Sequence, residues 1–232
     1  MIDIRKSADR GYFDHGWLKT YHSFSFADYY DENHMGFRTL RVINQDVIRP
    51  EYGFGMHPHR DMEIITVVIS GALTHKDSTG TEAIIRPGDI QRMTAGQGIV
   101  HSEINESESE PVHLLQIWIL PDEQGRQPEY EQKTFSPSGK ENRLRLIASP
   151  DGRDDSVTIH QDVLLHESVI QEGIVLSYDF GDRRFGWIQL LSGKIEVNGH
   201  RLEAGDGASI SGESRVDITG MADSEFLLFD LD

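Results

Sequence analysis

Four residues in the first half of the chain have types and spacings that could bind a metal ion. His57 and His59 are separated by one residue, and so are His101 and Glu103. Side chains alternate between the two faces of a β-strand, so each pair would share a face if it lies on a strand. Two such strands meeting inside a barrel would bring three imidazoles and one carboxylate to a single point. That set suits a divalent first-row transition metal, with coordination positions left open for a substrate.

One pair of this kind would be weak evidence, because most histidines in a soluble protein lie at the surface or make structural hydrogen bonds. Two pairs in one domain, bordered by glycines and separated by hairpin-like spacing, favour a metal site. Three other histidines could also be functional, but simpler interpretations are favoured for them. We expect His22 to be packed, His34 to lie in a loop, and His113 to have a structural role.

Short predicted strands surround the two pairs and would position them. Between the pairs lies a β-branched run, residues 63–71, that ends in a Ser-Gly turn, and Pro87 and Gly88 mark a second turn. Regular spacing of such strands favours an all-β sandwich or barrel with little helix. The strands are predicted at residues 22–26, 40–48, 63–70, 72–76, 82–86, 90–93, 112–120 and 144–148.

The composition argues against several classes of function. The chain has 232 residues, of which 37% are hydrophobic, enough for one large β domain or two smaller ones. The net charge of −17 repels phosphate backbones, so we expect no direct binding to nucleic acid. There is no cysteine, hence no disulfide framework and no cysteine nucleophile. Without a signal core or a long apolar run, we expect a cytoplasmic protein that does not enter membranes. The oligomeric state stays open, and a monomer is compatible with the sequence.

An internal repeat predicts two copies of one fold. The run VISG at residues 68–71 resembles LLSG at residues 190–193, and each is followed by a hairpin and a Gly-Asp turn. Residues 121–155, between the copies, are polar and rich in turn formers, which predicts a domain boundary. The position that holds His57 in the first copy holds Asp179 in the second. We therefore expect no equivalent metal site in the second copy.

Five stretches of the chain together resemble a known family. They are residues 22–26 (HSFSF), 35–44 (MGFRTLRVIN), 53–63 (GFGMHPHRDME), 95–103 (AGQGIVHSE) and 113–121 (HLLQIWILP). They resemble the pirin family of bicupins, and most closely the bacterial pirin-like proteins regarded as quercetin 2,3-dioxygenases. The resemblance covers nearly the whole chain and implies an all-β fold of two antiparallel cupin (jelly-roll) barrels.

The resemblance also implies where the domains and the metal ligands lie. It predicts an N-terminal metal-binding cupin barrel at residues 1–135 and a C-terminal cupin barrel without a metal site at residues 136–232. The sequence departs from the family at residues 60–63, which are RDME where many members have Arg-Gly-Phe-Glu. This change alters the strand beside the site but touches no ligand. The four metal ligands carry over to His57, His59, His101 and Glu103.

The activity implied by the resemblance is that of a metal-dependent dioxygenase. Such an enzyme opens the heterocyclic ring of a flavonol such as quercetin with O2 and releases carbon monoxide, and its partners are therefore a small aromatic substrate and O2. Glu103 would be the catalytic base that accepts the flavonol hydroxyl proton. We expect one divalent transition metal ion, with Fe as the first candidate and Mn, Co, Ni, Cu or Zn as alternatives.

The alternative is a pirin-like, metal-dependent regulatory module that binds a protein partner without turnover. The two hypotheses differ in the cavity that they require. A deep, aromatic-lined cavity over the metal would favour catalysis, whereas a sealed site would favour regulation.

Overall fold

The computed structural model describes all residues from Met1 to Asp232. Its 22 strands are accompanied by one four-residue helix, α1 (Pro137–Lys140), and two short 3-10 helices. No helix is long and apolar enough to cross a membrane. The chain forms two compact units. The N-terminal unit comprises Gly11–Thr134 and Val157–Gln161, and the C-terminal unit comprises Met1–Arg10, Phe135–Ser156 and Asp162–Asp232.

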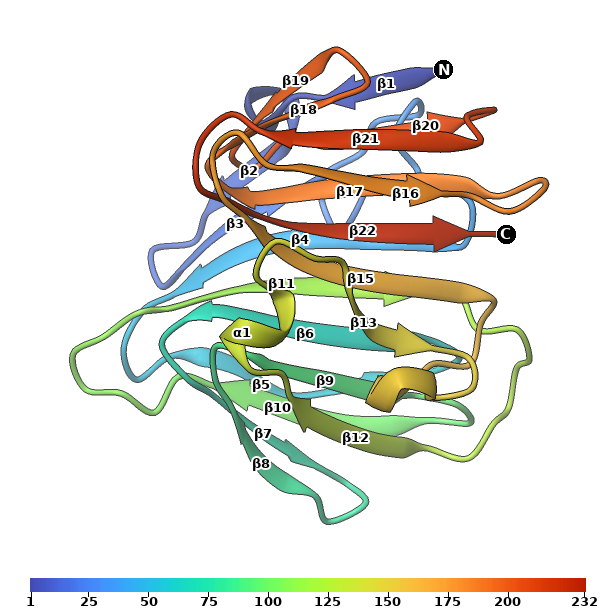
Figure 1. Cartoon of the computed structure of the whole chain (residues 1–232). Helices are drawn as coiled ribbons and strands as arrows, with labels where there is room; N and C mark the ends of the chain where they lie inside the picture. The colour runs from blue at the N-terminus through green and yellow to red at the C-terminus, as the bar shows by residue number, and fades with distance from the viewer. The chain divides into compact units, whose positions relative to one another are not determined.

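The N-terminal unit consists of antiparallel strands in two sheets. Its strands are β2 (Gly11–Asp14), β3 (Leu18–His22), β4 (Leu40–Ile48), β5 (Gly53–His59), β6 (Glu63–Ser70), β7 (Leu73–Asp77), β8 (Glu82–Ile85), β9 (Asp89–Thr94), β10 (Ile99–Ile104), β11 (Val112–Ile119), β12 (Glu129–Thr134) and β14 (Val157–Thr158). The larger sheet has the order β12-β9-β6-β11-β4-β3-β2, and the smaller sheet has the order β5-β10-β7-β8 (Figure 1). The predicted β-branched run forms β6, in the middle of the larger sheet.

Apolar side chains from both sheets form a hydrophobic core in the N-terminal unit. Ile48, Val68 and Leu114 of the larger sheet pack with Leu73 and Ile85 of the smaller sheet. Each of the five is at most 3% exposed. Burying one such side chain contributes about 1.5–3 kcal/mol. This core can therefore hold the two sheets together without help from a metal ion.

The C-terminal unit has a similar construction. Its elements are β1 (Ile2–Arg5), η1 (Ser7–Asp9), α1, β13 (Arg145–Ser149), η2 (Arg153–Asp155), β15 (Val163–Ile170), β16 (Val175–Asp179), β17 (Phe185–Ser192), β18 (Lys194–Val197), β19 (His200–Glu203), β20 (Gly207–Ser211), β21 (Arg215–Gly220) and β22 (Ser224–Leu231). Within this unit the strands of the larger sheet have the order β1-β20-β17-β22-β15-β13, and the smaller sheet has the order β16-β21-β18-β19. Buried residues of both sheets, among them Ile188, Leu228 and Ile218, form its core.

The strand order of the two units confirms the predicted repeat. The sheet β5-β10-β7-β8 corresponds to β16-β21-β18-β19, and the strands β9-β6-β11-β4 correspond to β20-β17-β22-β15. The two Ser-Gly turns lie at matching places, with φ of +81° at Gly71 and +82° at Gly193. A side chain is strained in this region of φ. At Gly71 a Cβ atom would also lie 2.6 Å from the carbonyl oxygen of Pro111, so both space and conformation require glycine.

Neither unit is a closed barrel, in contrast to the expected jelly-roll barrels. In the N-terminal unit, the edge strands β2 and β12 of the larger sheet form no ladder with β5 and β8, the edge strands of the smaller sheet. Backbone hydrogen bonding therefore stops at the sheet edges, and side-chain packing joins the two sheets. The predicted all-β, antiparallel fold is confirmed, but the predicted closure of each unit into a barrel is not.

The strand predicted at residues 22–26 is wrong. Strand β3 ends at His22, and both Ser23 and Ser25 are as well buried as Phe24, which lies between them. The backbone N–H of Asp31 donates to Ser25 Oγ, and this hydroxyl donates to the carbonyl of Asp31. The alternation of apolar and polar residues here reflects a compact loop held by the Ser25 hydroxyl, not a strand with one exposed face.

The chain also divides differently from the expected split after residue 135. Strand β1, near the N-terminus, pairs with β20 and therefore belongs to the C-terminal unit. Residues 157–161 return to the N-terminal unit. There Arg92 Nε donates to the carbonyl of Thr158 at 2.6 Å, and the Thr158 N–H donates to Glu131 at 2.8 Å. These pairings join residues that are distant in sequence, so local sequence patterns could not predict them.

Candidate metal centre

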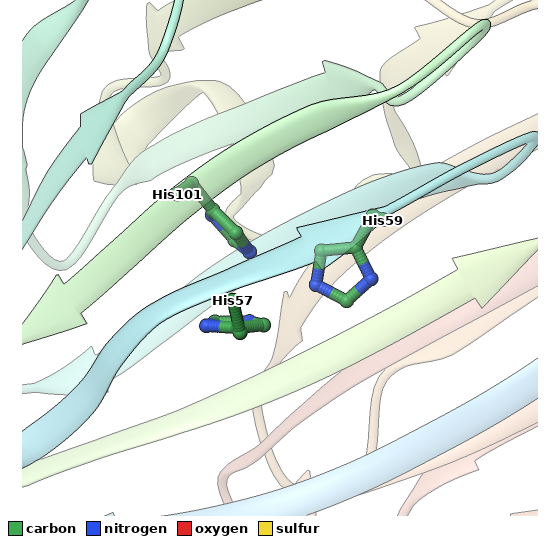
Figure 2. A group of neighbouring side chains, drawn as sticks. All are labelled: His57, His59 and His101. Carbon is green, nitrogen blue, oxygen red and sulfur yellow. The ribbon is translucent and has the colours of Figure 1, made fainter.

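The two predicted ligand pairs lie on neighbouring strands of the smaller sheet. Strands β5 and β10 are antiparallel, and their register places His101 opposite His57 and Ile99 opposite His59. The ring centroids of His57 and His101 are 4.4 Å apart, and the His59 centroid is 4.8 Å from each. Figure 2 shows the three rings converging from the two strands. We call His57, His59 and His101 the histidine cluster; a ring nitrogen of each lies within 4.8 Å of the others.

Glu103, the fourth predicted ligand, follows His101 on β10 but with a shifted register. A β-bulge between the two residues places Glu103 opposite Phe54. Its carboxylate forms a second group with His101 and His75, whose ligand atoms lie within 4.8 Å of one another. The structure thus brings three of the predicted ligands into one cluster and places Glu103 in an overlapping group that shares His101.

His75 was not singled out by the sequence analysis. It lies on β7, the other neighbour of β10, and its side chain is completely buried. The signal that could have revealed it is its spacing from Asp77, since the two are separated by one residue like the predicted ligand pairs. His75 Nε2 lies 3.0 Å from Asp77 Oδ2, and the His75 ring packs against Tyr130 with a centroid separation of 4.9 Å.

Burial keeps the imidazoles of His59 and His101 in their neutral form. It lowers the pKa of His101 to about 2, and the neighbouring histidines lower it further. Burial also lowers the pKa of His59 to about 4, assisted by His57. At pH 7 both rings therefore carry a lone pair that can bind a metal ion. His57 Nδ1 donates to the Gly55 carbonyl at 2.7 Å, which leaves its Nε2 available as a ligand.

The donor set fits a transition metal ion. His101 Nε2 is buried and has no hydrogen-bond partner in the protein. A buried polar atom without a partner is costly, and coordination would satisfy it. Neutral imidazoles bind Fe, Ni, Cu and Zn, and a nearby carboxylate is a compatible further ligand. The residues present are therefore suited to one divalent transition metal.

Glu103 is buried in a way that disfavours its charge. Its Oε2 accepts a hydrogen bond from Gln116 Nε2 at 2.6 Å, and its Oε1 lies 3.5 Å from Thr66 Oγ1. Burial raises the pKa of Glu103 to about 7, the bond from Gln116 opposes this rise, and the negative charge of Asp46 adds to it. A pKa near neutrality is suited to a group that exchanges a proton with a substrate.

A cavity of about 440 Å³ adjoins the histidine cluster. Its walls are rich in aromatic side chains, including Trp17, Phe26, Phe54 and Trp118. The Trp118 ring stands edge-on to His59, with centroids 4.9 Å apart and an interplanar angle of 84°. Cavities of this size that combine apolar walls with a few polar groups are typical binding sites for small molecules.

Polar atoms without partners also line this cavity. The Asp46 side chain is 2% exposed, and its Oδ1 has no hydrogen-bond partner. Burial raises the pKa of Asp46 to about 7, against the hydrogen bond from Thr20. Gln116 Oε1 is likewise buried without a partner. Hydroxyl groups on a bound ligand would satisfy both atoms.

The three other histidines that the sequence analysis considered are placed as predicted. The His22 ring is packed and bonds to Asn44 Oδ1 at 2.6 Å, although it also lines the cavity. His34 lies in the loop before β4 and bonds to Asp31. The His113 ring bonds to Gln45 on the neighbouring strand.

Different residues occupy the matching positions of the C-terminal unit. Asp179, which matches His57 in the repeat, is exposed and pairs with Arg215 at 3.4 Å. Ile218, which matches His101, is completely buried in the apolar core. Both groups of closely spaced candidate ligand atoms lie in the N-terminal unit.

Together, the repeated two-sheet units and the histidine cluster of the first unit define a bicupin with a candidate metal centre. Comparison with known proteins gives the family. The family model described as Pirin matches residues 3–119, and the model described as the quercetinase C-terminal cupin domain matches residues 146–231. The chain belongs to the pirin family.

Full-length relatives support this assignment. The chain is 46% identical to quercetin 2,3-dioxygenase from Escherichia coli K12 over 232 residues, which cover all of this chain and 99% of the relative. It is 43% identical to a pirin-like protein from Caulobacter vibrioides, with 99% of each chain covered. The crystal structure of the E. coli bacterial pirin YhhW in complex with nickel(II) matches with a TM-score of 0.95 and 45% identity, covering 100% of this chain and 99% of the other.

Proposed function

We propose that the protein is a metal-dependent dioxygenase of the quercetin 2,3-dioxygenase type. The reaction opens the heterocyclic ring of a flavonol such as quercetin with O2. Both oxygen atoms enter the ring-opened product, and one ring carbon leaves as carbon monoxide. The observation that carries the proposal is the aromatic-lined cavity of about 440 Å³ that adjoins the histidine cluster. The name of the E. coli relative, quercetin 2,3-dioxygenase, supports the same activity.

His57, His59 and His101 would hold the metal, with Glu103 as the fourth ligand. When bound, the metal supplies a Lewis acid that lowers the pKa of a flavonol hydroxyl. Iron suits chemistry with O2, and the nickel(II) complex of the E. coli pirin supports the view that the site accepts other divalent ions.

The residues of the chain would bind the substrate and move its proton. Trp17, Phe54 and Trp118 would pack against the flavonol rings and exclude water from the cluster. Glu103 would accept the hydroxyl proton on a carboxylate oxygen, because its raised pKa, about 7, makes it a competent base near neutral pH. Gln116 would keep that carboxylate in place through its 2.6 Å hydrogen bond.

Measurement of carbon monoxide tests the proposal directly. Purified protein loaded with Fe(II), and in parallel with Ni(II), is mixed with quercetin without oxygen, and O2 is then added. We expect carbon monoxide in proportion to the quercetin consumed. In Glu103→Gln we expect a loss of about 10²- to 10⁴-fold in rate, the usual cost of removing a general base. Glu106→Gln, which neutralises a side chain that is 56% exposed, is the matched control and should keep full activity.

Two results would change the assignment. Fully loaded protein that releases no carbon monoxide would contradict the dioxygenase and favour the regulatory, protein-binding alternative. Turnover that is undiminished in Glu103→Gln would keep the reaction but remove Glu103 as its base.

A further inference from the structure

A buried chain of hydrogen-bonding groups lies behind the histidine cluster. It consists of Asp77, His75 and His101. Asp77 and His75 belong to β7, and the register between β7 and β10 places Asp77 opposite His101. His75 Nε2 lies 3.0 Å from Asp77 Oδ2, and His75 Nδ1 lies 3.4 Å from His101 Nδ1. His75 does not line the cavity, whereas His101 does.

The Asp77 carboxylate is fixed as an acceptor by the turn that follows β7. Its Oδ1 accepts hydrogen bonds from the Thr79 N–H at 2.8 Å, the Thr79 hydroxyl at 2.6 Å and the Thr81 N–H at 3.2 Å. An ionised carboxylate has no proton to donate. The proton between Asp77 and His75 therefore belongs to His75 Nε2.

This proton determines where the next one lies. A neutral imidazole that carries its proton on Nε2 has an acceptor at Nδ1. His75 Nδ1 can then be satisfied only by a proton on His101 Nδ1, its partner at 3.4 Å. His101 consequently has a bare Nε2, and this is the nitrogen that is buried without a hydrogen-bond partner.

We propose that Asp77 and His75 are positioning residues that hold His101 in its Nδ1–H form, with Nε2 directed to the metal. The inference rests on the metal site proposed above. Partners of this kind fix the tautomer and the ring orientation of a ligating histidine and increase its basicity. Asp77 and His75 lie on β7, the strand next to that of His101. The tautomer of His101 is therefore set by two residues that do not touch the metal.

A competing arrangement uses the same residues differently. His75, His101 and Glu103 could themselves form a buried metal site, because their ligand atoms lie within 4.8 Å of one another. In that arrangement His75 and His101 would bind through the two Nδ1 atoms. The positioning role is favoured because His101 Nε2 is buried without a hydrogen-bond partner, and binding of His101 through Nδ1 would leave that nitrogen unsatisfied.

The variant Asp77→Asn separates these possibilities through metal affinity. The asparagine can keep the bonds from Thr79 and Thr81 with its oxygen and then presents N–H to His75 Nε2. This reverses both imidazoles and moves the His101 proton onto Nε2, where it blocks the ligand atom. We expect Ni(II) to bind about 10- to 100-fold more weakly in competition with a chelator. Asp89→Asn, which alters another buried turn carboxylate of the same unit, is the matched control and should keep the wild-type affinity.

A measurement on unmutated, metal-free protein keeps the proposal testable if the variant does not fold. Nitrogen-15 NMR of the histidine rings reports the tautomer directly, and we expect the His101 proton on Nδ1. A proton on Nε2, or wild-type Ni(II) affinity in Asp77→Asn, would overturn the proposal. So would a complete loss of binding in His75→Phe together with unchanged binding in His57→Ala, which would place the metal in the competing site. None of these measurements needs turnover, so the proposed dioxygenase activity can fail independently.

Discussion

Replacing Glu103 by glutamine should stabilise the metal-free protein at alkaline pH. The carboxylate is 3% exposed, lies near Asp46 and accepts its hydrogen bonds from two neutral groups, Gln116 and Thr66. Glutamine has nearly the same shape and can still accept the hydrogen bond from Gln116. The substitution therefore removes a buried charge while it leaves the packing unchanged.

The magnitude follows from the pKa of Glu103, which is raised from 4.5 to about 7. At about 1.36 kcal/mol for each tenfold change in an ionisation constant, the ionised carboxylate destabilises the folded state by about 3 kcal/mol. The cost is fully present above pH 7, where Glu103 is ionised in both states. It is absent below about pH 4.5, where the group is protonated in both. Between these limits the folded state binds more protons, so the unfolding free energy falls as the pH rises.

Urea unfolding of chelator-treated protein at pH 4.5 and pH 8 measures this difference. We expect Glu103→Gln to exceed the wild type in unfolding free energy by up to about 3 kcal/mol at pH 8 and to match it near pH 4.5. Glu106→Gln should show no such pH dependence. A glutamine variant that is less stable than the wild type by the same amount at both pH values would refute the reasoning, because the burial of Glu103 would then carry no electrostatic cost.

Two further predictions concern the metal and the fold. Elemental analysis should give one transition metal ion per chain, and two ions that are removed independently would contradict this. His57→Ala should lose the ion but still unfold cooperatively, and a variant that is already unfolded would contradict that expectation. Gly71→Ala should lower the unfolding free energy by about 1–3 kcal/mol, and by more than Gly80→Ala, since both glycines have positive φ but only Gly71 has a backbone oxygen within 3 Å of the added carbon. Equal losses of unfolding free energy in the two variants would show that the close contact between the added carbon and the Pro111 carbonyl oxygen has no energetic cost.

Local sequence patterns predicted the elements well where a run rich in β-branched residues ends in a turn signal. The strands predicted at residues 40–48 and 63–70 match β4 and β6 residue for residue. Both are rich in β-branched side chains and end in turn signals, which are short-range properties. The one-residue spacing of His57 and His59 likewise predicted a shared face, because alternation in a strand is a local rule.

Features that depend on pairing between strands were beyond such patterns. The register that places His101 opposite His57 is set by the whole sheet, and the bulge that shifts Glu103 has no signature in the sequence. The contact between His75 and His101 also joins two strands. At residues 22–26 the alternation was present, but loop hydrogen bonds from Ser25 compete with the strand conformation that it suggested.

The pairing of β1 with β20 has a consequence for how the protein can be made and divided. Ile2 pairs with Ile210 and Ile4 with Ala208, so β1 is synthesised long before the strand with which it pairs. A fragment that starts at residue 136 would leave the edge of β20 open and remove Ile2 and Ile4 from the core that they cover. Such an exposed edge invites pairing with a second copy. Studies of the C-terminal unit in isolation therefore need residues 1–10 restored, either as an added peptide or by joining them to the fragment through a circular permutation.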